Sequence, residues 1–310
     1  MFGYSNIRKE CDTVTIPKID VHVHTTMYTD IDMPRFGGDH FASPEEIRKK
    51  YTEWGIEKGI ILPEVANECA FSVQSNEDAY TIAHTYSDLF WWFCNLSPRM
   101  GNNDDKTDFS KFIEHYKRMG ALGVGELTMN MYFDDPMTEN LLYHCGECDM
   151  PVIIHIAPHM YGCYGIIDDI GLPRLEKILK KYPKLRIIGH SQPFWAEISS
   201  DVTPENRNSY PCGKVTQGRL ANLLREYDNL FCDMSAGSGY NAMARDPDHA
   251  YRFMEEFQDK MMFGTDICAP HNEMKLSHWL DDAVNNGCIS QTVYRKICRE
   301  NAIRILKIDI

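Results

Sequence analysis

The sequence has no long hydrophobic run and no excess of basic residues. No segment approaches the roughly 18 consecutive apolar residues of a membrane-spanning helix, and the N-terminal region has no apolar stretch of signal-peptide length. Acidic residues number 45 against 32 basic ones, so the formal net charge is −13. A chain without a basic surface is a poor partner for nucleic acid or for an anionic membrane. We therefore expect a cytoplasmic protein with neither kind of partner.

Motifs of several common enzyme classes are also absent. The sequence has no GxxxxGK[ST] or GxGxxG loop for phosphate groups, and it has no GxSxG nucleophile. Its 11 cysteines are odd in number and irregularly spaced, which is typical of reduced thiols and not of a disulfide framework. Cys145 and Cys148 form a CxxC motif without a second pair nearby, and we interpret them as two packed thiols.

Short apolar runs alternate with longer helical patterns along the whole chain. The eight runs predicted as strands are Ile19–His24, Gly59–Pro63, Leu89–Leu96, Gly123–Leu127, Val152–Ile156, Leu185–His190, Asn229–Asp233 and Met261–Asp266. Each interval between them is long enough for a helical crossover. A length of 310 residues would suit two domains, but no linker or repeat divides the chain. The pattern predicts an α/β protein, with a single (β/α)8 TIM barrel domain over residues 1–310.

Several helix ends are also readable. Ser43, followed by Pro44 and by Glu46 at the third helical position, predicts a helix start with a capping box. Further helices are predicted over 108–119 and 172–182. The longest irregular stretch, about 191–214, follows the sixth predicted strand, and loops of that length are usually functional or flexible.

The first predicted strand contains two closely spaced histidines. Because side chains alternate along a strand, we expect Asp20, His22 and His24 on one face, with the intervening valines packed against helices. Two imidazoles about 7 Å apart on a twisted strand can reach one cation. The motif alone is a weak signal, because about half an HxH is expected by chance in a chain with this many histidines.

Other predicted strands supply further candidate metal ligands beside this histidine pair. Among the titratable residues at or beside the ends of these strands, we single out Glu126, His155, His190 and Asp266. Chemistry in an α/β barrel takes place at the carboxyl ends of the strands, so these side chains are expected to converge. Imidazole and carboxylate are the ligands that borderline divalent metals prefer. A metal lowers the pKa of bound water to about 7, and a nearby carboxylate can act as the general base.

A known family shares a set of residues with this chain in order and spacing: Asp20-Val21-His22-Val23-His24, His155, His190 and Gly264-Thr265-Asp266. The predicted carboxyl-terminal helix Val293–Leu306, with Asn301-Ala302-Ile303-Arg304-Ile305-Leu306, also looks like the final helix of that family. On these residues the chain resembles the amidohydrolase superfamily, and within it the amidohydrolase-related (amidohydrolase 2) metal-dependent hydrolases. The resemblance extends from Ile19 to Leu306 and implies a (β/α)8 barrel.

The resemblance also implies roles for the site residues. His22 and His24 would hold the more buried metal, and His155 would be a further ligand. Asp266 would be a ligand that also handles a proton of the nucleophilic water. His190 would be a ligand of a second metal or an acid/base residue.

Glu126 stands where many binuclear relatives carry a carbamylated lysine. As a bridging ligand it would support two metals, and as a carboxylate that contacts substrate or another ligand it would leave a site for one. Both interpretations stay open. The expected cofactor is Zn²⁺, or another divalent metal such as Mn²⁺, with one or two ions per subunit.

Five residues after the predicted strands are candidate substrate contacts. Arg99 follows the third strand and Arg245 the seventh, and an arginine there can hold a carboxylate bidentately. His159 and His271 lie in loops after the fifth and eighth strands, and Trp195 could form an aromatic wall after the sixth. The simpler alternatives are surface salt bridges for the arginines, solvation for the histidines and loop packing for Trp195.

We expect a metal-dependent hydrolase that acts on a small carboxylated substrate. Metal-activated water would attack a carbonyl-type carbon with Asp266 as general base, and His190 or the metal would stabilise the oxyanion. An alternative is a metal-dependent non-oxidative decarboxylase of an aromatic or enolic acid, a reaction that relatives with the same ligand set perform. A third hypothesis is a non-catalytic metal-binding barrel, which would be expected to lose part of the set. A homodimer stays open, because dimers are the commonest assembly.

Overall fold

The computed structural model describes residues 15–29, 40–68 and 74–310. Its strands form two parallel sheets in the orders β1-β2-β3 and β4-β5-β7-β8-β9, and a short β6 pairs with β5. The strands are β1 (Lys18–Val23), β2 (Ile56–Ile61), β3 (Phe90–Trp92), β4 (Val124–Leu127), β5 (Val152–Ala157), β6 (Ile166–Ile167), β7 (Ile187–His190), β8 (Leu230–Asp233) and β9 (Met261–Met262). Each of the eight predicted runs overlaps one strand, although β2 begins three residues before its run, and β6 is an addition that the sequence did not predict.

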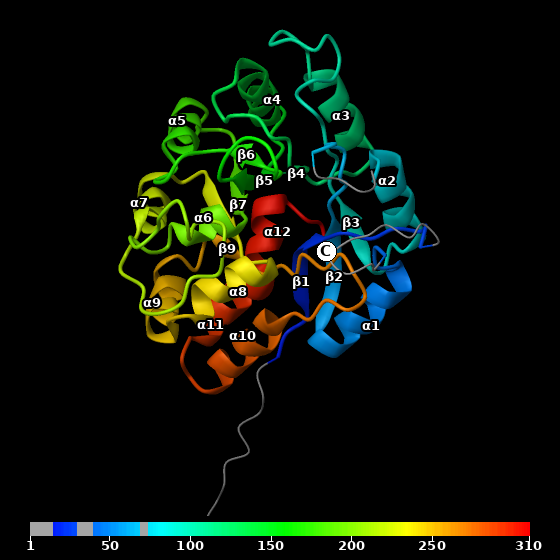
Figure 1. Ribbon diagram of the computed structural model, residues 1–310. Coiled ribbons are helices and arrows are strands. Elements are labelled where there is room, and N and C mark those ends of the chain that lie inside the picture. The colour runs from blue at the N-terminus through cyan, green and yellow to red at the C-terminus, as the bar shows by residue number, and fades with distance from the viewer. Residues whose placement is uncertain (1–14, 30–39, 69–73) are drawn as a thin grey trace, which may run out of the picture.

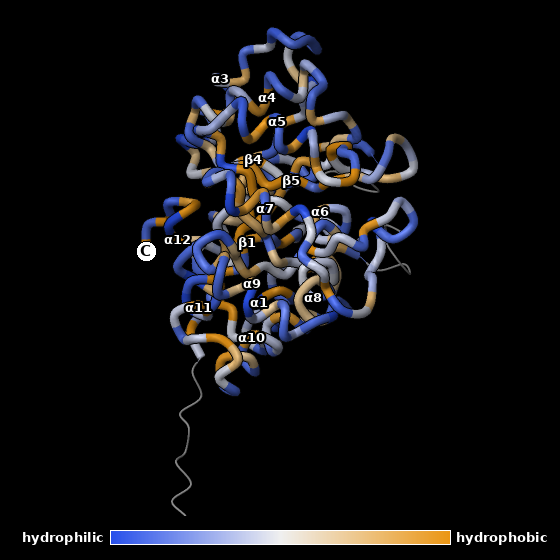
Figure 2. The backbone as a smooth tube through the Cα atoms, turned by 90° about the vertical axis from the view of Figure 1, so that its left-hand side faces the viewer, coloured by the Kyte–Doolittle hydropathy of each residue, from blue (hydrophilic) through white to orange (hydrophobic). Residues whose placement is uncertain are grey.

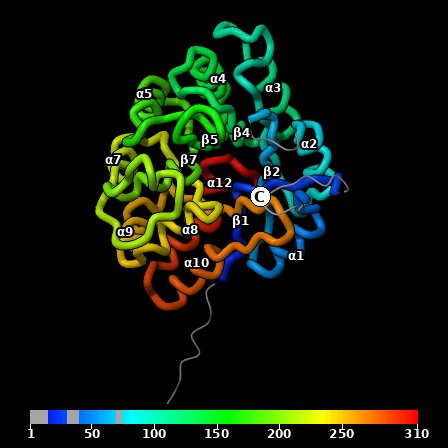
Figure 3. The backbone as a smooth tube through the Cα atoms, in the orientation of Figure 1, coloured from blue at the N-terminus to red at the C-terminus, as the bar shows by residue number. Residues whose placement is uncertain are grey.

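Backbone hydrogen bonds join the two sheets into a ring. Next to β3, the amide of Cys94 donates to the carbonyl of Gly123 at 3.0 Å, and the amide of Gly125 donates back to Cys94 at 2.8 Å. Beyond β9, the amide of Asp266 donates to the carbonyl of His22 on β1 at 2.8 Å. Figure 3 follows the same closure, since the orange segment at α10 comes back beside the blue segment at α1. The predicted α/β TIM barrel is confirmed.

Helices surround this ring (Figure 1). They are α1 (Pro44–Trp54), α2 (Asn76–Thr85), α3 (Ser110–Arg118), α4 (Pro136–Glu147), α5 (Pro173–Lys181), α6 (Gln192–Ala196), α7 (Arg219–Glu226), α8 (Ala236–Ala244), α9 (Pro247–Glu256), α10 (Lys275–Asn285), α11 (Gln291–Arg295) and α12 (Asn301–Leu306), with a π-helical turn at Lys296–Glu300. The predicted capping box is present, since Ser43 Oγ accepts from the amide of Glu46 and the Glu46 carboxylate accepts from the amide of Ser43. Within the described residues, no helix is long and apolar enough to cross a membrane.

Apolar side chains fill both faces of the ring. One cluster packs the strands against the helices, and the other lies inside the barrel, where strands contribute alternate residues such as Ile153, Ile188 and Met262. The interior cluster is completed by α12 through Ile305 and its neighbours. In Figure 2 the hydrophobic colour gathers at strands such as β4 and β5, while the outer loops are mostly hydrophilic. The ring is therefore a packed core, and polar residues are left for the strand ends.

β1 departs from the strict alternation that the sequence predicted. Ile19 and Val21 belong to the interior cluster, and Val23 belongs to the cluster beneath the helices. Asp20 faces α1, where the hydroxyl of Tyr51 donates to its carboxylate at 2.7 Å. The pairing of β1 with β2 shifts register between Asp20 and Val23, as at a β-bulge. The predicted common face of Asp20 with His22 is wrong, and so is the predicted packing of Val21 against a helix, because the irregularity breaks the period of two.

Candidate metal centre

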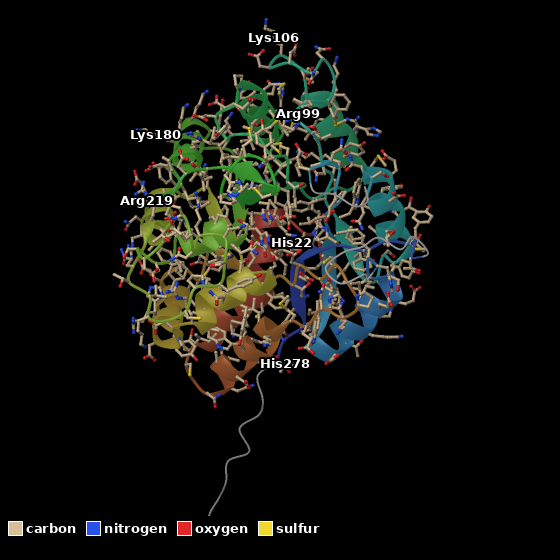
Figure 4. The ribbon with its side chains drawn as sticks, viewed as in Figure 1. His22, Arg99, Lys106, Lys180, Arg219 and His278 are labelled. Atoms are coloured by element: carbon tan, nitrogen blue, oxygen red, sulfur yellow. The ribbon has the colours of Figure 1, made fainter. Side chains whose placement is uncertain are left out.

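Six side chains converge at the carboxyl ends of five strands. They form two groups of possible metal ligands, in each of which the ligand atoms lie within 4.8 Å of one another: His22 with His24 and Asp266, and Glu126 with His155 and His190. These are the six residues that the sequence predicted for a metal site. Figure 4 shows His22 near the middle of the molecule, at the centre of the ring.

The first group points its ligand atoms at a common position. The Nε2 atoms of His22 and His24 lie 3.1 Å apart, and Asp266 Oδ1 lies 3.5 Å from each of them. Ligands at about 2.1 Å from a tetrahedral zinc ion lie about 3.4 Å from one another, so this spacing fits one bound ion. The donor set of two imidazoles and a carboxylate fits a borderline divalent metal.

Both histidines of this group are held through their other ring nitrogen. Nδ1 of His22 lies 2.6 Å from Oδ2 of Asp233, and Nδ1 of His24 lies 2.9 Å from the carbonyl oxygen of Leu62. Such partners fix the ring orientation and leave Nε2 to the metal. The imidazoles are therefore oriented before any ion binds.

Glu126 stands between the two groups. Its Oε2 lies 3.7 Å from Nε2 of His22 and 3.8 Å from Nε2 of His24. Its Oε1 lies 2.7 Å from Nδ1 of His155 and 3.8 Å from Nε2 of His190. One oxygen thus faces each group, and this geometry accommodates either a bridging carboxylate or a carboxylate that His155 holds beside a single ion.

Sequence reasoning missed Asp233, the last residue of β8. Its carboxylate is fully buried and contacts His22, lies 3.2 Å from Nδ1 of His190, and accepts a hydrogen bond of 2.7 Å from the hydroxyl of Ser235. A Cβ at Gly264 would approach Asp233 Oδ1 to 2.6 Å, so only glycine leaves room for this carboxylate. The rule that identified the other residues, a titratable side chain at a strand end, would also have identified Asp233.

Charges within the cluster shift the pKa values of its members. Burial lowers the pKa of His24, but Asp266, Glu64 and Glu126 outweigh burial and raise it to about 9. Burial likewise opposes ionisation of Asp266, yet the neighbouring imidazoles hold the pKa of that carboxyl below its usual value. Without a metal the centre therefore favours charged imidazoles beside ionised carboxylates, and a cation that binds must displace protons.

His190 belongs to the second group of possible ligands. Its burial lowers the pKa, but the hydrogen bond and charge of Asp233, together with Glu126 and Asp266, raise it to about 9. Nε2 of His190 lies 3.7 Å from Oδ2 of Asp266. This ring therefore faces the same carboxylate as the two β1 histidines and holds a proton readily.

The predicted substrate contacts lie in varied surroundings. The Trp195 indole is only 2% exposed, and its N–H donates to the carbonyl of Asp233 at 2.9 Å. Trp195 therefore packs against the end of β8 and holds it by this hydrogen bond. Arg99 is paired with Glu68 at 3.1 Å, and in Figure 4 it lies well apart from His22. His159 and His271 are exposed in the loops after β5 and β9.

Arg245 and Tyr164 also lie in segments that follow strands of the barrel. The Arg245 side chain is 2% exposed, and its Nη2 is paired with Asp201 Oδ2 at 2.9 Å. The ring of Tyr164, which sequence reasoning missed, lies 4.4 Å from the ring of His155, measured between centroids. No sequence motif marks Tyr164, because its contact with His155 depends on how the loop after β5 folds back.

Comparison with known proteins places the chain in a family. A family model described as amidohydrolase matches residues 19–308. A search of curated proteins returned no match. The chain belongs to the amidohydrolase family, whose members are metal-dependent enzymes that act on small molecules, as the resemblance in the sequence implied.

Solved structures share the fold at low sequence identity. An amidohydrolase from Burkholderia multivorans with bound zinc is 13% identical with a TM-score of 0.60, over 95% of this chain and 100% of that one. A 2,6-dihydroxybenzoate decarboxylase from Rhizobium is 16% identical with a TM-score of 0.57, over 94% and 99%. A probable 2-pyrone-4,6-dicarboxylic acid hydrolase from Acinetobacter baumannii, with citric acid bound, is 13% identical with a TM-score of 0.58, over 94% and 100%.

Proposed function

We propose that this member of the amidohydrolase family is a single-domain, metal-dependent hydrolase of a small carboxylated substrate. The observation that carries the proposal is the convergence of His22 Nε2, His24 Nε2 and Asp266 Oδ1 within 3.1–3.5 Å of one another, at the carboxyl end of the barrel. The cofactor we propose is Zn²⁺, or Mn²⁺ in its place, with one or two ions per subunit. The zinc in the structure from Burkholderia multivorans supports this choice.

His22, His24 and Asp266 would hold the ion, and His190 with Glu126 would complete the site or hold a second ion. When bound, a divalent ion supplies a Lewis acid and lowers the pKa of coordinated water to about 7. Asp233 keeps the imidazole of His22 in the orientation that presents Nε2. The Asp233 carboxylate thus supports the site by orienting His22, and it would not contact the substrate.

Asp266 is suited to act as the general base. Its side chain is 28% exposed, against 0% for His22 and 3% for His24, so within the first group it is the member that reaches the open side. Its lowered pKa keeps it ionised at neutral pH, ready to accept the proton of the attacking water. His190, which faces Asp266, would donate a hydrogen bond to the substrate oxygen as charge develops on it.

A second candidate function is non-oxidative decarboxylation of an aromatic or enolic acid. It is supported by the fold shared with the 2,6-dihydroxybenzoate decarboxylase from Rhizobium and by the aromatic ring of Tyr164 beside His155. In this reaction His190, whose pKa is raised to about 9, would donate its proton to the carbon that loses carbon dioxide. The two reactions need the same donor set, so a substrate assay must separate them.

The test combines metal content with a substrate panel. The metal-loaded protein should hydrolyse esters, lactones or amides of small carboxylic acids, and H22N or D266N should lose both metal and turnover. The control is H84N, because His84 is exposed on α2 and remote from the centre. Full turnover by metal-stripped protein would overturn the metal mechanism, and carbon dioxide release without hydrolysis would overturn the hydrolase in favour of the decarboxylase. Two equivalents of metal would make Glu126 the bridge, and one would leave it beside a single ion.

We also propose that the enzyme works in the cytoplasm. Five cysteines of the described segments, Cys94, Cys145, Cys148, Cys232 and Cys298, are buried free thiols, which supports a reducing compartment. The acidic net charge of −13 supports a protein without nucleic-acid partners. A homodimer is the assembly to test first, because it is the commonest.

A further inference from the structure

Ser235 lies behind the metal centre, where it begins α8. It occupies the N-cap position, at which a serine hydroxyl usually accepts a hydrogen bond from an amide of the first helical turn. Within the described residues, the Ser235 side chain accepts no such bond. The residue is fully buried, so its hydroxyl has to find partners in the protein. The hydroxyl therefore serves something other than the helix.

The partners of this hydroxyl are one carboxylate and two imidazoles of the centre. Oγ of Ser235 lies 2.7 Å from Oδ2 of Asp233 and 3.0 Å from Nδ1 of His190. Nδ1 of His22 lies 3.3 Å from the same Oγ and 2.6 Å from Asp233 Oδ2. His22, His190 and Asp233 belong to β1, β7 and β8. One hydroxyl thus connects side chains from three strands.

The direction of each hydrogen bond follows from which groups can donate. The amide of Ser235 donates to Asp233 Oδ1 at 2.8 Å, while the Ser235 hydroxyl and Nδ1 of His22 contact Oδ2. Three donors around one carboxyl group favour its ionised form, which can only accept. The hydroxyl proton of Ser235 therefore points at Asp233, because two oxygens 2.7 Å apart need a proton between them. Since a hydroxyl has one proton, Oγ accepts from Nδ1 of His190.

We propose that Ser235 is a positioning residue that keeps a proton on Nδ1 of His190. Nδ1 donates to Ser235 Oγ, with Asp233 Oδ2 as a second acceptor at 3.2 Å. Nε2 is then the nitrogen that the ring presents to the centre, where it lies 3.8 Å from Glu126 Oε1 and 3.7 Å from Asp266 Oδ2. A ring fixed through one nitrogen offers the other in a constant orientation.

The opposite tautomer of His190 is unfavourable at this place. It would set the bare lone pair of Nδ1 against the oxygens of Ser235 and Asp233. Without the Ser235 hydroxyl, the remaining oxygen of this pair lies 3.2 Å from Nδ1, and it already accepts from His22. The ring would therefore be held less firmly. The inference rests on the proposed function only in so far as His190 acts on the substrate, and it holds for hydrolysis and decarboxylation alike.

The first test locates the proton and needs no turnover. In zinc-loaded protein with isotope-labelled histidines, nitrogen–hydrogen correlation spectra show which ring nitrogens carry protons. The signals of His190 are identified by their loss in H190N. We expect a proton on Nδ1 of His190 in the unaltered protein. A bare Nδ1 with a proton on Nε2 would overturn the proposal.

The second test removes the hydroxyl. In S235A the Nδ1 proton of His190 should exchange with water about tenfold faster, and its resonance should shift, because the nearer acceptor is gone. S277A is the matched control, since Ser277 is also fully buried and its hydroxyl donates to the carbonyl of Trp54 at 2.8 Å. S277A should leave the His190 proton unchanged. An unchanged exchange rate and resonance in S235A would contradict the proposal.

A kinetic readout separates positioning from a purely structural role. With the substrate in hand, S235A should lower kcat about 10–100-fold and leave KM within about twofold, whereas S277A should change neither. An unchanged kcat in S235A would also count against the proposal. If no substrate of either class is turned over, the proposed function fails, while the His190 proton still decides this inference. If S235A fails to fold, the unaltered protein decides it, because locating the proton needs no substitution at Ser235.

Discussion

The two ends of the barrel are equally buried but chemically opposite. At the amino end, interior residues such as Ile60 and Ile188 pack against Ile305 and Leu306 of α12. At the carboxyl end, the same ring encloses buried imidazoles and carboxylates, among them His22, Glu126 and Asp233. Burial of apolar surface stabilises the fold, whereas burial of charged groups costs desolvation that pairing only partly offsets. The amino end is thus built for stability, and the carboxyl end keeps costly groups where chemistry needs them.

The largest expected effect is a loss of turnover, caused by a substitution at the carboxyl end of the barrel. H22N should reduce turnover to about one thousandth or less, because it removes a metal ligand from the group that would activate water. Thermal unfolding of the metal-free protein should change less than turnover does, since asparagine keeps a polar amide beside Asp233 and no apolar core is lost. Metal analysis and activity of purified H22N, beside H84N, test this. A variant that unfolds instead would break the comparison between the two ends.

A substitution at the amino end should have the opposite result, a loss of stability with activity retained. I305A should lower the free energy of unfolding by about 2–5 kcal/mol, because it opens a cavity between α12 and the strands. Metal content and kcat should stay close to those of the unaltered protein below the unfolding transition. Urea denaturation measures the first quantity and metal analysis the second. I303A, at a partly buried position of the same helix, should cost less. A loss of metal in I305A would show that the ends are coupled.

A smaller effect is expected for the carboxylate behind the metal site. D233N should weaken metal affinity about 10–100-fold, because it removes the partner that orients His22. The amide keeps the shape of the side chain, so the fold should persist. Competition with a chelator of known affinity measures the change, and D228N, a surface position before β8, is the control. Unaltered affinity in D233N would mean that the orientation of His22 comes from the backbone alone.

Metal binding should also depend on pH. The pKa of His24 is raised to about 9 in the metal-free protein, so below that pH the imidazole must lose a proton before it can bind an ion. Metal affinity should therefore fall about tenfold for each pH unit below about 9, for each proton displaced. Calorimetry in buffers of different ionisation enthalpy counts the released protons. Metal uptake at pH 7 without proton release would contradict the prediction.

The smallest effect concerns Asp20, a fully buried carboxylate of β1 that faces α1. Y51F removes the hydroxyl that donates to this buried carboxylate at 2.7 Å, while the amides of His22 and Thr265 still donate to it. The free energy of unfolding should fall by about 1 kcal/mol. Denaturation of Y51F measures it against Y86F, whose exposed hydroxyl contacts Glu45. An equal cost in both variants would mean that burial of the hydrogen bond contributes nothing.

The strands were predictable because both faces of a strand in a parallel barrel are buried. Such strands therefore appear in the sequence as nearly continuous apolar runs. β6 was missed, since two residues carry no periodic signal. The face of Asp20 was predicted wrongly because a local register shift leaves no mark in a run of alternating residues. The six residues predicted for a metal site were chosen from their place at or beside strand ends, and the structure brings them together. Asp233 was overlooked although it obeys the same rule.

The sequence by itself determined the barrel class, the order of the strands and the residue types at their carboxyl ends. Those features follow from local patterns of hydrophobicity and from the position of each residue along its strand. Only the tertiary structure decided that Asp233 orients His22 and that the Trp195 indole holds the end of β8. These contacts join residues far apart in the chain, and no local pattern encodes such distances.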